Sequence, residues 1–346
     1  MALWLVRAGK YGEHEPRFFD DNRIYLTWEA LTTDLSTAKT YNDIKAIMQA
    51  HYPGEPARRV GNWSGQAWAF ALAMKPGDWI VVPRKAKGTI AVGEITSGYQ
   101  FDAKTTTVYN HYRSVKWLHT DVPRSAFDQD LLYSIGAIMT VCEIKRNDAE
   151  KRVRAMAKAG WKSVPVKPAL GATAAPSDAE AAEEGDVDLE QLARDAIAKV
   201  IIQKFKGHGM ARLVEAVLKA QGFTTHLSPE GPDKGIDILA AGGSFGFDRP
   251  RICVQVKSGD APADRPEFTQ LIGAMQSVQA DQGLFVAWAG FKPTVLKEVP
   301  THFFKVRLWN DTDLIEQLLD NYDKLDQDIK AELPLKRIWT LATPDE

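Results

Sequence analysis

Short apolar stretches separated by turn residues fill the first 145 residues and predict mostly β structure. The runs Trp79–Pro83 and Thr89–Ile95 flank a basic turn, the pattern of a β-hairpin in a small barrel. Other positions follow the same logic, with strands expected near residues 4–7, 22–26, 99, 112–118 and 137–144 and helices at 41–48 and 64–74. We therefore predict a mostly β barrel with a few helices.

From residue 188 onward the apolar spacing changes to that of helices alternating with strands. A helix over 188–205 and a second over 210–221 precede Gly222, a suitable residue to end the second helix. Strands are expected at 223–227, 235–240, 251–257, 284–287 and 304–308, with a helix at 264–279 and a helical, charged tail at 311–346. This order predicts an α/β sandwich with a mixed sheet flanked by helices.

The segment between the two halves, residues 166–187, is rich in Ala, Pro, Gly and acidic residues and nearly lacks large apolar side chains. Such a segment buries too little surface to offset the entropy of ordering it, so it is interpreted as a flexible tether. The chain is therefore predicted to be α+β, with an N-terminal domain at 1–165, a linker at 166–187 and a C-terminal domain at 188–346.

Composition limits the class of protein and its compartment but does not indicate a function. The 346 residues are 45% hydrophobic and 25% charged, and no apolar run approaches the length of a bilayer span. The N-terminus lacks the pattern of a secretory signal, and Cys142 and Cys253 show no zinc-binding spacing, so we expect a cytoplasmic protein away from membranes. The net charge of −2 argues neither for nor against nucleic-acid binding, because the basic residues are clustered along the chain.

Three polar residues stand on two otherwise apolar strands. Side chains alternate along a strand, so Gln255 and Lys257 project to one side while Val254 and Val256 face the core. Asp237 lies between two isoleucines on the preceding strand. A carboxylate, an amide and a lysine that converge can hold a divalent cation and orient a water against a phosphodiester.

This ordered set resembles the Mrr-type catalytic domain of the PD-(D/E)xK nuclease superfamily over about a hundred residues. The matching pieces are 213–223, 229–238, 254–258, 267–275 and 283–287. The resemblance implies a restriction-endonuclease-like fold that cleaves DNA with Mg²⁺. It also implies that Asp237, the amide oxygen of Gln255 and the carbonyl of Val256 hold the metal, while Lys257 orients the attacking water. Gln255 stands where most of the superfamily has Glu or Asp.

One position departs from that resemblance. Related domains often carry a Glu near the start of the first catalytic helix, where this chain has Ala211 and Arg212. Glu215 lies about one turn later and either substitutes for that Glu or is exposed to solvent. Two further candidates are Gln270, which would support the site, and Asp233, which would either contact the metal or stabilise the turn before the strand.

The N-terminal domain resembles the PUA-like superfamily related to EVE and YTH domains over about half of its length, on residues 76–83, 89–95 and 97–102. The resemblance implies a pocket for a modified or flipped-out base, stacked on aromatic side chains. The opposing interpretation is that these aromatic residues belong to the core, most clearly Trp68. The basic turn either straddles phosphates or is merely solvated. The candidates are Trp28, Asn62, Trp63, Ser64 and Tyr99 for the pocket and Arg84, Lys85 and Lys87 for phosphate.

The leading hypothesis is a modification-dependent restriction endonuclease that acts on double-stranded DNA carrying modified bases. Each cleavage domain holds one active site, so a double-strand break predicts a homodimer on DNA. Two alternatives stay open: a nuclease for unmodified, single-stranded or structured DNA, and a non-catalytic DNA-binding protein on a degenerate nuclease fold.

Overall fold

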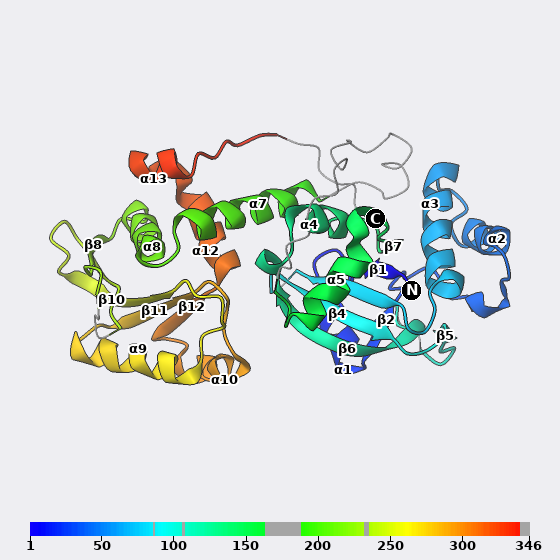
Figure 1. Ribbon diagram of the computed structural model, residues 1–346, viewed down its shortest axis with the longest axis horizontal. Coiled ribbons are helices and arrows are strands. Elements are labelled where there is room, and N and C mark those ends of the chain that lie inside the picture. Colours follow the sequence, from blue (N-terminus) through cyan, green and yellow to red (C-terminus); the bar gives the residue numbers. More distant parts are fainter. Residues whose placement is uncertain (86, 106–107, 163–187, 232–234, 340–346) are drawn as a thin grey trace. The chain divides into compact units, whose positions relative to one another are not determined.

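The computed structural model describes residues 1–85, 87–105, 108–162, 188–231 and 235–339, and it divides into two compact units, Met1–Asp195 and Ala196–Glu346 (Figure 1). The boundary falls within helix α7 (Leu189–Lys204). The first part of α7, which the sequence pattern assigns to the C-terminal domain, is grouped with the N-terminal unit. The predicted linker at 166–187 lies outside the described residues.

The N-terminal unit is built on one curled sheet with the strand order β2-β6-β4-β3-β1-β7 and with β5 paired to β6. Strands β1 and β3 run parallel, and the other described pairs are antiparallel. These pairings do not join β2 to β7, as a closed barrel would require. The strands are β1 (Leu3–Val6), β2 (Arg23–Tyr25), β3 (Trp79–Arg84), β4 (Thr89–Ile95), β5 (Gln100–Phe101), β6 (His111–Pro123) and β7 (Val141–Glu143).

Alternation along β1 and β3 divides their side chains between two apolar clusters. Leu3 and Leu5 belong to one cluster and Trp4 and Val6 to the other, because successive side chains point to opposite faces. The first cluster packs against α4 (Gln129–Ile135) and α5 (Ala149–Lys158). The second packs against α1 (Glu15–Asp20), α2 (Tyr41–His51) and α3 (Ala57–Trp68). Helix α3 begins earlier than the predicted residue 64, and it continues as a π-helical turn, η2 (Ala69–Ala73).

The C-terminal unit contains a mixed sheet with the strand order β12-β11-β10-β9-β8, which confirms the predicted architecture of this half. Strands β8, β9 and β10 form an antiparallel meander, while β10, β11 and β12 run parallel. The strands are β8 (Thr224–Leu227), β9 (Ile238–Gly242), β10 (Asp248–Lys257), β11 (Gln282–Ala287) and β12 (Val306–Trp309).

Helices cover both faces of this sheet (Figure 1). Helices α8 (His208–Ala220) and α12 (Asp311–Asn321) share one apolar cluster with the sheet, and α9 (Arg265–Ser277) shares the other. The shorter elements of this unit are α10 (Pro293–Leu296), α11 (Val299–His302), η5 (Tyr322–Lys324) and α13 (Gln327–Glu332), and those of the first unit are η1 (Leu35–Thr37), η3 (Arg124–Ala126) and η4 (Arg146–Asp148). No helix in the described part of the chain is long and apolar enough to cross a membrane.

Candidate active site

Strand β10 presents the two polar residues of the predicted site to helix α9. Val254 is buried in the cluster on the α8 face, whereas the Gln255 amide nitrogen donates to the Gln270 side-chain oxygen at 3.4 Å. Two residues later, the Lys257 ammonium lies 3.6 Å from the carboxylate of Glu267, also on α9. Gln255 and Lys257 therefore reach the same face of the sheet, as the strand alternation predicts.

Asp237 lies next to these residues, immediately before β9. Its backbone N–H donates to the Val254 carbonyl at 3.0 Å, and its carboxylate accepts a 2.7 Å hydrogen bond from the Val256 N–H. The register pairs Ile238 with Val254, so the next pair places Asp237 opposite Gln255. The sheet thus brings Asp237, Gln255 and Lys257 together at one end of β10.

The close approach of the chain to α9 explains a glycine beside the site. Gly235 has φ +79°, and a Cβ there would lie 2.7 Å from the Gln270 amide nitrogen. Only glycine combines that backbone conformation with that contact at little cost. Gly235 therefore lets the strand carrying Asp237 pass directly against the residue that contacts Gln255.

The donor set fits a hard divalent cation. Gln255 is 1% exposed, and its side-chain oxygen Oε1 is buried without a hydrogen-bond partner among the described residues. An orphaned buried acceptor is costly unless something binds it, and amide and carboxylate oxygens suit Mg²⁺. The described residues contain no cluster of three or more His, Cys, Asp and Glu residues that could hold a metal. Any cation at this site would therefore depend on the amide oxygen and on ligands from a bound molecule as well as on Asp237.

Cys253 lies on the same face of β10 but does not add a metal-binding thiolate. Burial, together with the charge of Asp237, raises the pKa of the Cys253 thiol to about 11. The thiolate is the form that binds metals and attacks electrophiles, so this side chain stays a protonated core residue near neutral pH.

A cleft of about 550 Å³ opens beside Asp237 and Lys257. Its wall includes Ala211, the position at which the nuclease resemblance expects a Glu, so a methyl group leaves open space there. His208 and Glu230 line the same cleft and were missed from the sequence. The signal for His208 was its position one turn before Ala211, because residues three apart share a helix face. The complete lining is Gly207, His208, Ala211, Pro229, Glu230, Gly231, Asp237, Val256, Lys257, Ser258 and Gly259.

Glu215 has a different environment from either of the two expected for it. It is 9% exposed, its carboxylate accepts a 2.8 Å hydrogen bond from the Thr225 hydroxyl, and it pairs with Lys219 at 3.1 Å. It is neither exposed nor part of the described lining of the cleft. These contacts make Glu215 a bridge between α8 and β8. Asp233 lies outside the described residues.

In the N-terminal unit, Trp28 and Trp63 are close neighbours in a partly exposed aromatic cluster with Tyr52. The ring centroids lie 6.5 Å apart for Trp28 and Trp63 and 4.7 Å apart for Tyr52 and Trp63. Asn62 is exposed beside them, and its side-chain oxygen accepts from Gln66 at 2.6 Å. Trp68, which we expected to be the most structural tryptophan, is instead 38% exposed.

The other two pocket candidates have structural partners. Ser64 is fully buried and donates to the Val60 carbonyl at 2.6 Å. The Tyr99 hydroxyl accepts from the Leu35 N–H at 3.1 Å and lies 2.7 Å from a His111 ring nitrogen, and burial raises the pKa of Tyr99. Because their polar atoms are already engaged inside the unit, neither Ser64 nor Tyr99 is placed to hydrogen-bond a base.

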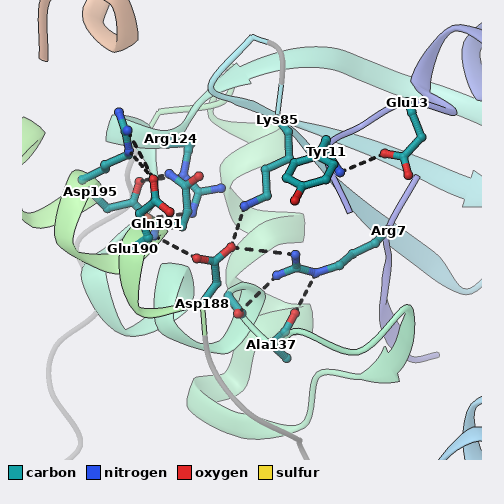
Figure 2. Close-up of polar contacts among 12 residues, drawn as sticks. Arg7, Tyr11, Glu13, Lys85, Arg124, Ala137, Asp188, Glu190, Gln191 and Asp195 are labelled. Carbon is teal, nitrogen blue, oxygen red and sulfur yellow. Dashed lines mark hydrogen bonds and ion pairs between the residues drawn. The ribbon is translucent and has the colours of Figure 1, made fainter. Parts of the chain in front are cut away.

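The basic turn after β3 is also engaged internally. Arg84 pairs with Glu15 at 3.1 Å and with Asp121 at 2.7 Å, and Lys87 pairs with the same Asp121 carboxylate at 3.1 Å. Lys85 pairs with Asp188, the residue before α7, at 2.5 Å (Figure 2). These carboxylates offset the charges of the turn inside the unit, and contact of the turn with phosphates stays a prediction.

Figure 2 shows what the turn does within the unit: it helps to hold the start of α7. Asp188 accepts from the Gln191 N–H at 3.0 Å, as an N-cap residue does, while Lys85 neutralises its charge. About two turns after Asp188, Asp195 accepts two hydrogen bonds of 2.6 Å from Arg124, and both side chains are buried. A bidentate pair of this kind fixes orientation as well as supplying energy.

Comparisons with known proteins agree with the geometry of the C-terminal unit. Residues 202–318, about a third of the chain, match a family described as "Restriction endonuclease", of the Mrr catalytic type. The C-terminal unit therefore carries a restriction endonuclease domain. Residues 4–144 match a family described only as a domain of unknown function. No curated protein matches the sequence.

Among solved structures, the chain shows a weak likeness to two restriction enzymes. One is the DNA modification-dependent restriction endonuclease AspBHI, at 15% identity and a TM-score of 0.33, covering 79% of this chain and 72% of that one. The other is the MspJI restriction endonuclease in complex with an oligonucleotide, at 14% identity and a TM-score of 0.32, covering 96% of this chain and 80% of that one. Both scores lie below the range expected of a shared fold.

Proposed function

We propose that this protein is a Mg²⁺-dependent DNA endonuclease whose N-terminal unit directs cleavage to DNA that carries modified bases. The observation that carries the nuclease part is the orphaned Oε1 of Gln255, buried opposite Asp237 and two residues from Lys257, inside a restriction endonuclease domain. Buried polar side-chain atoms are usually hydrogen-bonded, and this unsatisfied amide oxygen lies beside a carboxylate and a lysine.

Each residue at the end of β10 has a distinct task in this proposal. Lys257 donates to a phosphoryl oxygen or to the attacking water, and its positive charge offsets the negative charge that develops in the transition state. Glu267 and Gln270 hold Lys257 and Gln255 from α9. The Val256 N–H fixes one oxygen of Asp237 and leaves the carboxylate oriented toward the cleft that Asp237 lines.

Asp237, the Gln255 side-chain oxygen and the Val256 carbonyl would hold the Mg²⁺. When bound, the ion polarises the phosphoryl oxygen and lowers the pKa of a bound water. With few carboxylates in the site, substrate phosphate supplies much of the negative charge that retains the ion. We therefore expect metal affinity to be low without DNA and to rise when DNA is bound.

The aromatic cluster supports the proposal that the N-terminal unit recognises modified bases. Trp63 offers a partly exposed ring between Trp28 and Tyr52, and Asn62 supplies an exposed polar group beside it. Stacking on aromatic side chains is how an extruded base is held. In this proposal the nuclease domain reads backbone and metal, while the cluster supplies selectivity.

The test is Mg²⁺-dependent cleavage of matched DNAs that are unmodified or carry 5-methylcytosine, 5-hydroxymethylcytosine or N6-methyladenine. We expect cutting of one modified DNA, no cutting in EDTA, and loss of cutting in Lys257→Ala with DNA binding retained. Cutting of all four DNAs would keep the nuclease and remove the modified-base reader. Metal-dependent binding without cutting of any DNA would favour the non-catalytic alternative.

A matched pair of tryptophan variants tests the reader itself. Trp63→Ala is expected to weaken binding to the modified DNA selectively, and Trp68→Ala, on the same helix and 38% exposed, to leave the preference unchanged. An equal loss on all DNAs, or unfolding of Trp63→Ala alone, would make Trp63 a core residue.

A further inference from the structure

The turn between β9 and β10 carries two highly exposed phenylalanines whose rings stack on each other. Phe245 is 80% exposed and Phe247 is 75% exposed. Their rings are stacked, with centroids 6.3 Å apart and planes inclined by 21°. Side chains of this size are seldom left so exposed in pairs unless a partner covers them.

The backbone of this turn is held in place, so the exposed rings do not belong to a loose loop. Gly243 and Gly246 have φ values of +77° and +71°, which shape the turn on either side of Phe245. The Thr224 hydroxyl on β8 donates to the Gly243 carbonyl at 2.7 Å, and a Cβ at Gly246 would lie 3.1 Å from the Thr224 methyl group. Strand β8 thus supports the turn that displays the rings.

Two exposed arginines continue the series at every second position: Phe245, Phe247, Arg249 and Arg251. The Arg249 side chain is 79% exposed, and its guanidinium pairs with the Asp281 carboxylate at 3.0 Å. Arginine contacts phosphates, whereas apolar side chains insert between base steps and unstack them. A duplex offers both phosphates for arginines and base steps for inserted rings, so this order of side chains favours nucleic acid.

The same strand connects this turn to the candidate active site. Phe247 and Lys257 are ten positions apart, which at the rise of a β-strand spans at most roughly 33 Å. One turn of B-DNA is about 34 Å, or about ten base pairs. A duplex whose scissile phosphate lies at Lys257 and whose axis follows β10 has base steps within reach of the rings.

We propose that Phe245 and Phe247 form a wedge that inserts at a base step of double-stranded DNA within about one helical turn of the cleaved bond, with Arg251 on a flanking phosphate. The proposal rests on the proposed DNA cleavage for the position of the scissile phosphate. The wedge would bend or open the duplex and hold it at a set distance from the active site.

The experiment uses the full chain and duplexes of a sequence that it cleaves in Mg²⁺. Each duplex carries 2-aminopurine at one base step, and the steps on both sides of the cut are tested in turn. Fluorescence is measured in Ca²⁺ without Mg²⁺. We expect fluorescence to rise at one or two adjacent steps within about ten base pairs of the cut. Phe245→Ala/Phe247→Ala should abolish that rise and weaken binding by roughly tenfold. Arg251→Ala should reduce the dependence of log K on log salt by about one phosphate contact.

The control variant is Phe303→Ala/Phe304→Ala, which removes a second exposed pair, 50% and 88% exposed, from the same unit. It should leave both the fluorescence rise and the affinity unchanged, and all variants should unfold at the wild-type temperature. Unchanged fluorescence at every step with normal DNA binding would overturn the wedge and spare the nuclease. Absence of DNA binding by the wild type would instead overturn the proposed function. A change in sedimentation without DNA, in Phe245→Ala/Phe247→Ala only, would reassign the surface to a second copy of the chain.

Discussion

The Lys257 ammonium lies 3.6 Å from Oε1 of Glu267, whose other oxygen, Oε2, accepts a 3.0 Å hydrogen bond from the Asp264 N–H at the start of α9. One carboxylate therefore caps a helix and holds the lysine proposed to act in cleavage. The side chains of Lys257 and Glu267 are 39% and 35% exposed, so the ion pair itself contributes little to stability. Its value lies in the position that it gives Lys257.

Glu267→Gln keeps a hydrogen-bonding side chain at the helix start but removes the charge that attracts Lys257. We expect the unfolding free energy to change by less than about 1 kcal/mol and single-turnover cleavage to slow by roughly tenfold or more. Arg265→Gln, which breaks the neighbouring 2.8 Å pair with Glu298, is the matched control and should cleave normally. Wild-type cleavage by Glu267→Gln would show that Lys257 is positioned by something else.

Gln255→Leu separates function from stability at one position. Removing the orphaned amide oxygen should leave the metal-free protein as stable as the wild type or about 1 kcal/mol more stable, as measured by urea unfolding in EDTA. Cleavage should nevertheless be abolished, because the proposed cation loses a ligand. A stable variant that still cuts would exclude Gln255 from the metal site.

Gln255→Glu is the complementary change, since it places a second carboxylate opposite Asp237. We expect cleavage to persist at lower Mg²⁺ concentrations, because a charged oxygen binds the ion more strongly than an amide. In EDTA the same variant should be less stable, because the buried carboxylate at position 255 and the partly buried carboxylate of Asp237 repel each other. Comparison of the Mg²⁺ midpoint for cleavage with the wild type is the measurement.

His208→Ala tests a cleft residue that the sequence patterns did not single out. His208 is partly buried where the cleft meets the start of α8, so we expect slower cleavage or weaker DNA binding without loss of stability. His226→Ala provides the comparison, because His226 is exposed on β8 in the same unit and does not line the described cleft. Equal behaviour of the two variants would remove His208 from the site.

Asp78 gives the N-terminal unit a defined response to acid. Burial disfavours its charge, but hydrogen bonds from the Ala2 N–H, the Trp4 indole N–H and the Lys75 N–H outweigh burial and lower the pKa of Asp78. The folded pKa of Asp78 lies below the unfolded value of about 3.8. The stabilisation is therefore complete above about pH 3.8 and is lost as the pH falls through the folded pKa.

Asp78→Asn should therefore cost roughly 1–3 kcal/mol near neutral pH and less as the solution becomes acidic. Urea unfolding of the N-terminal unit, followed by tryptophan fluorescence at a series of pH values, measures the difference. A constant difference between the variant and the wild type across the acid range would contradict this role for Asp78.

The sequence alone determined the architecture of the C-terminal unit, because each local pattern there agrees with the tertiary fold. The run containing Val254, Gln255, Val256 and Lys257 specifies which side chains share a face, since a strand alternates whatever packs on it. The mixed sheet and its flanking helices follow from strands alternating with helical periods. Local periodicity was therefore enough to predict that Gln255 and Lys257 share one face of the strand, while the roles of Asp237, Gln255 and Lys257 follow from the family resemblance and stay a prediction.

Only the tertiary structure decided which ion pairs the side chains form and which side chains are buried. The sequence shows Arg84, Lys85 and Lys87 as a basic turn, but only the fold brings carboxylates from distant positions to pair with them. Likewise, Glu267 meets Lys257 across a helix–strand contact, and Ser64 turns out to be buried. Such pairings join residues far apart in the chain, and the periodicity of a single element carries no information about them.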